Sequence, residues 1–532
     1  MATSSPYAKL MDQIPDVQKE TSVKNPRLAA IDIGTNSIRC ICVEVVQNGD
    51  YRILDDEKAT VRLGEGLCAS GGISPAAWER ASEALLRMRK IIDGLGVEVI
   101  EAVATSAVRK ASNGAEFLAA MERETGIRVR LIDGREEAEL AALSAWHHFD
   151  MANARYLLVD IGGGSVEVVS AVGRHIEEIV SMELGAVFLS EKYLNKDPIP
   201  EKDLERLSRH IRKELRAALT GTDFPVRYLI GSGGTMTSIA AMVQAGRKER
   251  YDSVHGYEVL HSEIVHILAM LQRKSCKERK AVPGLSPERA DIIVAGVAVV
   301  EELMRLSGTN ILKINERGIR EGLILQSLHK HGLLEKRRTL RDWRTTVRDF
   351  ARSCHVDENH GEQVARLSLQ LFDALAVPFG LDQRARQLLE TAALLHDVGY
   401  FISYSAHHKH SYHLIRYAGL FDFSPREKEI IANVARYHRK SLPKRKHEGF
   451  AALSREDQGL VIKLGGILRL VDGLDRRRAG AVTGMECTLA DKSFRIKLAG
   501  TDDLSVEIYG GQVKGDLFRT AFGCRLELTG GG

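Results

Sequence analysis

Residues 28–45 read LAAIDIGTNSIRCICVEV, and residues 156–172 read YLLVDIGGGSVEVVSAV. Both stretches consist of an apolar run, Asp-Ile-Gly, two small residues, a serine and a second apolar run. Asp32 and Asp160, which precede the two turns, lie 128 positions apart, too far for a repeat of the solenoid type. We therefore expect two similar domains, each beginning with a β-hairpin that bends at a glycine-rich turn.

The rest of the chain suggests four folded parts, in line with about 100–200 residues per domain in a chain of 532. After each hairpin, short β-branched runs alternate with long amphipathic stretches, which is typical of α/β domains. Further on, the sequence predicts helix after helix and then alternating apolar and polar residues. We predict α/β lobe I at residues 27–150, α/β lobe II at 151–332, a helical domain at 333–483 and a β-rich segment at 484–532.

The two ends of the chain call for separate predictions. Residues 1–26 carry mixed charge and several prolines but no apolar core, so we expect a disordered leader and not a signal peptide. Near the C-terminus, residues 485–500, 504–511 and 524–530 alternate between apolar and polar, which predicts strands of a small β-sheet.

Composition excludes several classes of protein. Hydrophobic residues make up 44% and charged residues 27% of the chain, which is typical of a globular protein and not of a disordered one. Lys and Arg number 75 against 71 Asp and Glu, a surplus too small to indicate nucleic-acid binding. The seven scattered cysteines include no C-x-x-C pair, and no apolar stretch is long enough to span a membrane. We therefore expect a cytoplasmic protein that binds neither nucleic acid nor membrane.

Three glycine-rich loops are suited to binding phosphate. Two are the hairpin turns, and the third, GSGGTMTS at residues 231–238, follows an apolar run and precedes helical sequence. Gly, Asn, Thr and Ser allow a turn to point successive backbone N–H groups at an anion, and the third loop would place its amides at a helix N-terminus. One such loop alone is often structural, but three in paired lobes predict a phosphate-binding cleft.

Carboxylates near these loops suggest the chemistry. Asp160 and Glu167 flank the second turn on opposite hairpin arms and are suited to holding Mg²⁺, which would relieve their repulsion of a polyanion. The stretch GREEAE at residues 134–139 follows a predicted strand and begins a helix. A glutamate there could orient and deprotonate a water. Acidic residues are also favoured in the first turn of any helix, so a structural role remains open.

In order along residues 28–328, the motifs DIGTNSIR, TSAVRKASN, GREEAEL, DIGGGSVE, GSGGTMTS and GIREGL closely resemble the Ppx/GppA phosphatase family of the actin-like and sugar-kinase ATPase superfamily. The resemblance implies a two-lobed α/β fold and hydrolysis of the terminal phosphate of polyphosphate or of guanosine pentaphosphate, with Mg²⁺ and a glutamate-activated water. Similarity to long family members also implies a homodimer. Glu139 departs from the family pattern, which often has Arg there.

The family's functional residues map onto this chain by motif. The resemblance implies that Glu137 activates the water, that Arg109 binds phosphate and that Asp160 and Glu167 hold Mg²⁺. It implies three phosphate-binding loops, formed by Thr35, Asn36 and Ser37, by Gly163, Gly164 and Ser165, and by Gly233, Gly234 and Thr235.

Three functions are weighed on these residues. The leading prediction is a Mg²⁺-dependent exopolyphosphatase, and guanosine pentaphosphate 5′-phosphohydrolase is the alternative on the same residues. A non-catalytic regulator that binds ppGpp or polyphosphate would keep the glycine loops but could dispense with Glu137, whose presence favours an enzyme. A sugar kinase would need a second substrate pocket, for which we find no inserted domain.

Histidine is dense in the helical part, where nine of the 18 histidines lie between residues 355 and 447. Three separate predicted helices carry possible metal ligands, namely His360, the neighbouring pair His396 and Asp397, and Asp472. Imidazole and carboxylate groups suit a divalent transition metal or Mg²⁺. The order H, HD, D resembles the HD phosphohydrolase superfamily, which implies an all-α HD-type domain with a metal site on these four residues.

His410 and His438 are predicted to extend this site to a second metal. Many nucleotide-hydrolysing HD proteins have Lys shortly after the HD pair, whereas Tyr400 and Phe401 follow it here. Two alternatives remain open for this domain. Either it holds a metal and has a catalytic activity of its own, or it is an accessory to the cleft. The remaining histidines of the region are expected to be solvated or structural, namely His355, His407, His408, His413 and His447.

Overall fold

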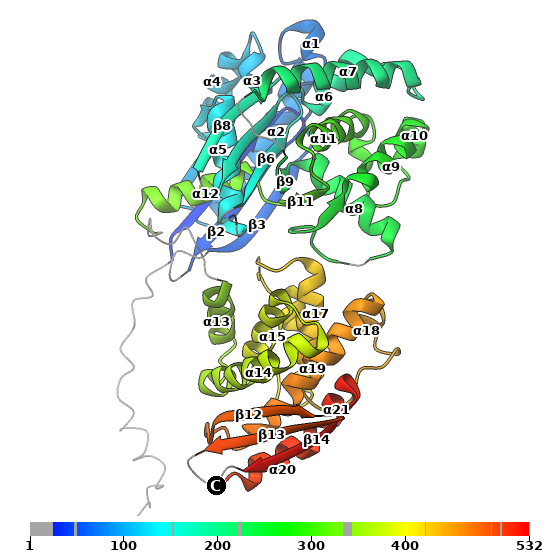
Figure 1. Ribbon diagram of the computed structural model, residues 1–532. Coiled ribbons are helices and arrows are strands. Elements are labelled where there is room, and N and C mark those ends of the chain that lie inside the picture. The colour runs from blue at the N-terminus through cyan, green and yellow to red at the C-terminus, as the bar shows by residue number, and fades with distance from the viewer. Residues whose placement is uncertain are drawn as a thin grey trace, which may run out of the picture.

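The computed structural model describes residues 25–46, 51–149, 151, 154–173, 175–220, 225–249, 251–333, 343–420, 422–490, 492–500 and 503–530. Most of the predicted leader lies outside the described residues. Figure 1 shows two α/β lobes above a helical part that ends in a small β-sheet, which has three strands. In the described part of the chain, no helix has the length and apolar character needed to cross a membrane.

Lobe I is built on a five-stranded sheet in the order β3-β2-β1-β4-β5. β1 and β2 form an antiparallel hairpin, whereas β4 pairs with β1 in parallel. Helices α2 and α4 pack on one face of this sheet, around buried residues such as Leu85 and Phe117. The elements are β1 (Arg27–Ile33), β2 (Ile38–Val45), β3 (Tyr51–Ala59), α1 (Leu67–Ser70), α2 (Pro75–Gly94), β4 (Val99–Ala104), α3 (Ser106–Lys110), α4 (Gly114–Thr125) and β5 (Val129–Leu131).

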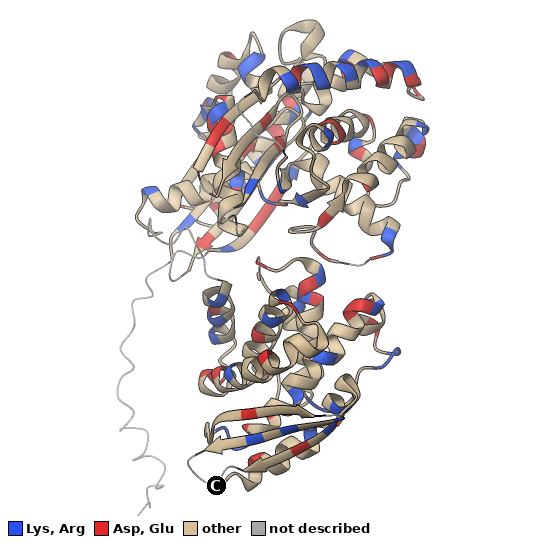
Figure 2. Ribbon diagram, viewed as in Figure 1, with Lys and Arg blue, Asp and Glu red and all other residues tan. Residues whose placement is uncertain are grey.

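Lobe II repeats the hairpin in a six-stranded sheet ordered β10-β11-β9-β6-β7-β8. Helix α11 is buried along most of its length, as its apolar sequence predicts. Acidic and basic residues are interspersed along α7 (Figure 2), which buries Leu207, Ile211 and Leu215 on its inner face. The elements are β6 (Arg155–Ile161), β7 (Val166–Val172), β8 (His175–Met182), α6 (Ala186–Tyr193), α7 (Glu201–Ala218), β9 (Tyr228–Ser232), α8 (Gly234–Arg247), β10 (Glu258–Leu260), α9 (His261–Gln272), α10 (Cys276–Arg279), η3 (Pro287–Arg289), α11 (Ile293–Ser307) and β11 (Ile311–Ile314).

Two helices join the lobes. α5 (Gly134–His148) places Ala138 and Ala142 against the sheet of lobe II and Leu140 against lobe I. α12 (Ile319–Lys330) lies within the range predicted for lobe II, but its apolar face packs on β1, β2 and β4 of lobe I. The chain thus returns to lobe I before it enters the helical part, a crossing that local sequence patterns do not encode.

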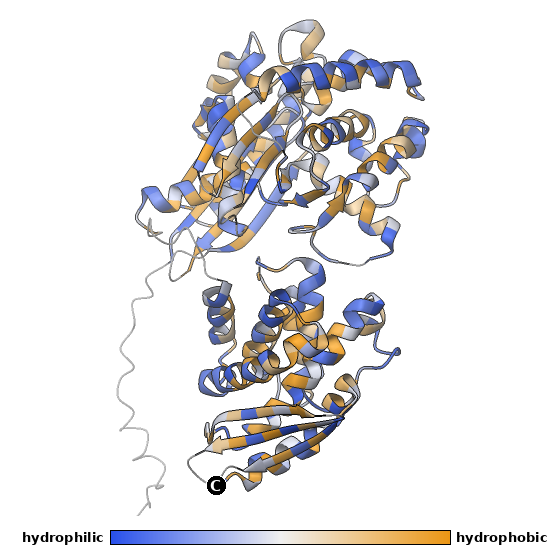
Figure 3. Cartoon of the chain, viewed as in Figure 1, coloured by the Kyte–Doolittle hydropathy of each residue, from blue (hydrophilic) through white to orange (hydrophobic). Residues whose placement is uncertain are grey.

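The helical part and the C-terminal sheet share one hydrophobic core. Hydrophobic residues concentrate on the strands and on the inner faces of the helices (Figure 3). The elements are α13 (Trp343–Ser353), α14 (Glu358–Phe379), α15 (Gln383–Leu395), η4 (Val398–Phe401), α16 (His407–Tyr417), α17 (Pro425–Arg436), α18 (Glu448–Ala451), α19 (Arg455–Leu474), β12 (Val482–Ala490), β13 (Ser493–Gly500), α20 (Ser505–Lys514), α21 (Asp516–Phe522) and β14 (Arg525–Gly530).

The strand predicted at residues 504–511 is wrong, because this segment opens the helix α20. Gly510 packs directly on Gly473 of α19, where a Cβ on Gly510 would lie 2.2 Å from the Gly473 carbonyl oxygen. Glu507 is buried and accepts from Arg477. A short alternation of apolar residues does not distinguish strand from helix. The close packing of this segment on α19 favours the helix. The predicted strands on either side are confirmed as β12, β13 and β14.

Candidate active site between the lobes

The turns of the two hairpins have the same hydrogen bond. The Gly34 amide donates to the Ser37 carbonyl in lobe I, and the Gly162 amide donates to the Ser165 carbonyl in lobe II, both at 3.1 Å. The two turns also meet, because a Cβ on Gly163 would lie 2.8 Å from Cβ of Thr35 in the first turn. Only glycine allows this approach, which brings the loops of both lobes to one cleft.

The third loop closes the cleft from the side of lobe II. Gly233 has a φ of +96°, in the region that favours glycine, and a Cβ there would lie 2.7 Å from the Ile161 carbonyl oxygen. Helix α8 begins at Gly234, which lines the cleft together with Gly233. The first amides of a helix have no partner within it, so this end of α8 is suited to an anion.

The cleft is a cavity of about 130 Å³, and the three predicted phosphate loops meet there. Thr235 is the exception among the predicted loop residues, because it is fully buried behind the loop and its hydroxyl accepts from Arg289 Nη2 at 3.3 Å. The predicted loop residues that line the cavity are Thr35, Asn36, Ser37, Gly163, Gly164, Ser165, Gly233 and Gly234.

Four carboxylates gather at this cleft, and three of them are buried. Asp160 and Glu167 lie directly opposite each other on β6 and β7, and Glu137 reaches the cavity from α5. Glu167 lines a smaller cavity that shares Asp160 with the cleft, and it accepts from Ser181 Oγ at 2.8 Å. The fourth is Asp32, which was not predicted as a site residue. In the internal repeat, Asp32 occupies the position equivalent to Asp160.

Burial raises the pKa of each of these carboxylates. It raises the pKa of Asp32 to about 6, and burial and the neighbouring Asp32 raise that of Asp160 to about 7. Burial and Asp160 raise the pKa of Glu167 to about 7. The pKa of Glu137 lies well above its usual value, first through burial and then through the other three carboxylates. Such a group of acids favours protons or a cation.

Glu137 is held at the start of α5. The Asp133 side chain caps this helix by accepting from the Glu136 amide at 2.8 Å, and Glu137, one residue on, is only 4% exposed. Arg109 Nη1 lies 3.7 Å from Glu137 Oε2 and donates to the Ile132 carbonyl. Arg109 thus lies beside the glutamate and outside the residues that line the cavity.

Glu139, where the family often has Arg, is exposed and forms an ion pair with Arg135 at 3.0 Å. It also lies outside the residues that line the cavity.

Three arginines that were not predicted also line the cavity, namely Arg39, Arg289 and Arg320. Arg39 lies opposite Asp32 in the first hairpin. Its position in the repeated motif, equivalent to that of Glu167, could have identified it as a site residue. Burial lowers the pKa of Arg289 to about 10. Arg289 comes from η3, more than 200 residues from the first loop, and no local pattern marks it.

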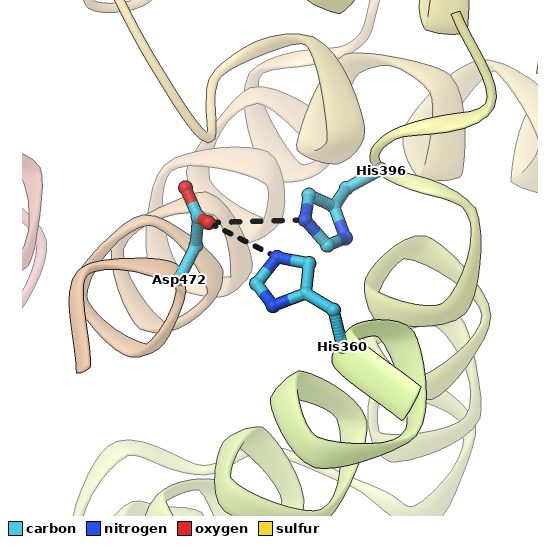
Figure 4. A group of neighbouring side chains, drawn as sticks. All are labelled: His360, His396 and Asp472. Atoms are coloured by element: carbon cyan, nitrogen blue, oxygen red, sulfur yellow. Dashed lines mark ion pairs between the residues drawn. The ribbon is translucent and has the colours of Figure 1, made fainter. Parts of the chain in front are cut away.

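The histidine-rich part contains two clusters of possible metal ligands. His360, His396 and Asp472 face one another (Figure 4), each offering a ligand atom within 4.8 Å of the others. Asp397, His407 and His438 form a second cluster of the same kind. His410 belongs to neither cluster, whereas His407, which was expected to be solvated or structural, is buried in the second.

Comparison with known proteins agrees with this geometry. Residues 42–331 match the Ppx/GppA phosphatase family, and residues 343–507 match Ppx/GppA phosphatase domain III. An exopolyphosphatase structure from Cytophaga hutchinsonii is 29% identical, with a TM-score of 0.54 over 57% of this chain and 98% of that chain. A Ppx/GppA family member from Aquifex aeolicus is 28% identical, with a TM-score of 0.50 over 57% and 98%.

The first match covers more than half of the chain, and it includes lobe II and most of lobe I. The N-terminal region therefore has the actin-like and sugar-kinase-like fold of these phosphatases. Members of the family act on polyphosphate or nucleotide phosphates. This chain belongs to the Ppx/GppA phosphatase family and is a phosphoanhydride hydrolase.

Proposed function

We propose that the protein is a Mg²⁺-dependent exopolyphosphatase that releases the terminal phosphate of polyphosphate with a water activated by Glu137. The observation that carries the proposal is the meeting of three glycine-rich loops and buried carboxylates in one cavity. Phosphoryl transfer depends mainly on positioning and charge neutralisation, and the loops and arginines of the cleft supply both. The resemblance to long family members supports a cytoplasmic homodimer.

The carboxylates fit a divalent cation. Asp32 Oδ1, Glu137 Oε2 and Glu167 Oε2 are buried and accept no hydrogen bond from the described residues. Buried oxygens of this kind need a compensating partner, and hard cations prefer oxygen ligands. Asp160 and Glu167 would hold Mg²⁺, which when bound would offset charge on the transferred phosphoryl group.

The chain's own residues have separate tasks. The amides of the glycine loops and the hydroxyls of Thr35 and Ser37 hold the terminal phosphate, and Arg39 and Arg289 neutralise its charge. Glu137 orients the water and takes its proton. Its raised pKa makes it a stronger base than an exposed glutamate, which suits a catalyst that works near neutral pH.

The test is phosphate release from long-chain polyphosphate by Glu137→Gln and by a matched control, Glu139→Gln. The control lies on the same helix but is exposed and paired with Arg135. We expect turnover to fall by about 10²–10⁴-fold in Glu137→Gln, the usual contribution of general base catalysis, with polyphosphate binding retained. Equal activity in the two variants would contradict the role of Glu137.

The same residues would serve guanosine pentaphosphate, so both substrates belong in the assay. A higher kcat/KM on guanosine pentaphosphate would replace the exopolyphosphatase by the nucleotide phosphohydrolase. Binding of either ligand without any phosphate release would instead indicate a regulator.

A further inference from the structure

A second cavity lies next to the cleft. It has a volume of about 170 Å³, against about 130 Å³ for the cleft. Three residues line both cavities, namely Thr35, Ser106 and Gly164. These three residues form the wall between the two spaces, and none of them is larger than threonine.

The wall is thin because Gly164 has no side chain. A Cβ on Gly164 would lie 2.6 Å from Ser106 Oγ and 3.0 Å from Thr35 Oγ1. Ser106 is 2% exposed and Thr35 is 6% exposed, and Ser106 Oγ has no hydrogen-bond partner among the described residues. A buried hydroxyl without a partner costs free energy. A phosphate oxygen at the wall would supply the acceptor that this hydroxyl lacks.

The second cavity reaches the surface between the lobes. Cys68 of α1 and Glu183, which precedes α6, line it and are exposed. Figure 1 shows α1, α3 and α6 at the end of the lobes that faces away from the helical part. The other lining residues are Gly64, Leu67, Ala107, Lys110, Val187 and Phe188. A molecule that passes the wall therefore leaves the protein at this end.

Two contacts join the lobes at this opening. The Gly66 amide donates to Glu191 Oε1 at 3.0 Å, and Lys110 Nζ lies 2.8 Å from Glu183 Oε1. The Glu183 side chain is 67% exposed. Ion pairs at the surface contribute about 0–1 kcal/mol, so the opening can widen at little cost.

The two cavities differ in charge. Arg39, Arg289 and Arg320 line the cleft, and none of them lines the second cavity. Among the residues that line the second cavity, the basic side chain is Lys110, which is paired with Glu183. The cleft is therefore suited to holding a polyanion. The second cavity is suited to letting an anion pass, because a passage must bind its cargo weakly enough to release it.

The proposed function gives such a passage a use. In-line hydrolysis places the attacking water and the leaving chain on opposite sides of the phosphorus, so free phosphate forms at the end of the cleft away from the chain. Thr35, whose hydroxyl holds the terminal phosphate in this function, belongs to the wall. A polyphosphate chain that stays bound fills the opening through which it entered. The free phosphate then needs a second opening.

We propose that orthophosphate leaves through the second cavity, past Thr35 and Ser106, while the shortened chain stays in the cleft. Ser106 Oγ donates a hydrogen bond to the phosphate as it passes. The inference rests on the proposed function, because it needs a long substrate whose terminal phosphate lies against Thr35. It goes beyond that function by giving substrate and product separate paths.

The test plugs the second cavity at Cys68. Full-length protein is labelled with a bulky maleimide at pH 8.5, because desolvation and the neighbouring Glu191 raise the pKa of the Cys68 thiol and only the thiolate reacts. Cys68→Ser protein, treated in the same way, is the matched control for label on the other cysteines. Cys68→Trp provides a plug without any label. Thermal unfolding verifies that each protein is folded.

Two quantities are followed from the first turnover on, namely total cleaved phosphate after acid quench and free phosphate bound by a fluorescent phosphate sensor. With long-chain polyphosphate, we expect the first cleavage to keep its rate in labelled protein and in Cys68→Trp, and the release of free phosphate to slow about tenfold or more. With tripolyphosphate, the pyrophosphate product leaves the cleft and frees the entrance, so the plug should have little effect on release.

Three results would overturn the proposal. Unchanged release from long chains in the plugged proteins would show that phosphate leaves by another path. Equal slowing of cleavage and release on both substrates would show that the plug disturbs the cleft itself. Absence of phosphate release from polyphosphate by the unlabelled wild type would contradict the proposed function, and the inference would fail with it.

Discussion

Arg39 and Glu167 occupy equivalent positions in the two lobes, each directly across a β-hairpin from an aspartate. Arg39 pairs with Asp32 in the first hairpin, and Glu167 pairs with Asp160 in the second. The repeated hairpin thus presents a cation on one side of the cleft and an extra carboxylate on the other. This asymmetry separates a side suited to phosphate from a side suited to a metal ion.

Replacing Arg39 by Gln should weaken phosphate binding in the cleft. Arg39 lines the cavity, and its Nε is buried without a hydrogen bond in the described structure. A charge-assisted hydrogen bond contributes about 1.5–3 kcal/mol, so we expect kcat/KM for polyphosphate to fall about 10–100-fold. Steady-state phosphate release measures this. Arg135→Gln, at an exposed surface pair, is the control, and an equal effect in both variants would contradict the assignment.

Gly233→Ala should damage both the cleft and the stability of the fold. The φ of +96° and the Ile161 carbonyl oxygen 2.7 Å from the added Cβ make alanine strained there, at a cost of about 1–3 kcal/mol. Activity should fall at least tenfold together with a lower Tm. Gly246→Ala is the matched control near the end of the same helix, where a Cβ meets nothing within 4 Å. It should leave activity unchanged and raise Tm slightly.

The loops that line the cleft could be recognised in the sequence because each of them is local. Each glycine loop and the two elements that flank it lie within about 20 residues, so the repeat around Asp32 and Asp160 was enough to identify two of the three loops. Arg289 was missed because only tertiary packing brings η3 to Gly234. His407 was missed for the same reason. The two clusters bring together residues from α14, α16 and α19 with residues just after α15 and α17, and local spacing does not reveal such a convergence.

Without Mg²⁺, stability should decrease as pH rises toward 7. The pKa values of Asp160 and Glu167 are raised to about 7 in the folded state, against about 4 in the unfolded chain. Between pH 4 and pH 7 the folded protein therefore binds more protons, so the free energy of unfolding falls as pH rises. Bound Mg²⁺ replaces these protons and should raise Tm more at pH 7.5 than at pH 5.

Calorimetry with and without Mg²⁺ at these two pH values measures this dependence. Asp160→Asn removes one of the titrating groups and should reduce the difference. A Mg²⁺ effect on Tm that is equal at both pH values would argue against a cation on these carboxylates.

Replacing Arg109 by Met should shift the pH dependence of turnover, in addition to any loss of affinity. Arg109 Nη1 lies 3.7 Å from Glu137 Oε2, and its charge opposes the rise in the pKa of Glu137 caused by burial and the neighbouring carboxylates. Without that charge the pKa of Glu137 rises further, and the base is protonated over a wider pH range. The acidic limb of the kcat profile should therefore move to higher pH, with activity partly recovered on going from pH 7 to pH 9.

Lys110→Met, at the adjacent position and paired with Glu183 at 2.8 Å, should keep the wild-type profile. If the variant at Arg109 lowers kcat by the same factor at every pH, this arginine interacts with the substrate alone and does not affect the pKa of Glu137.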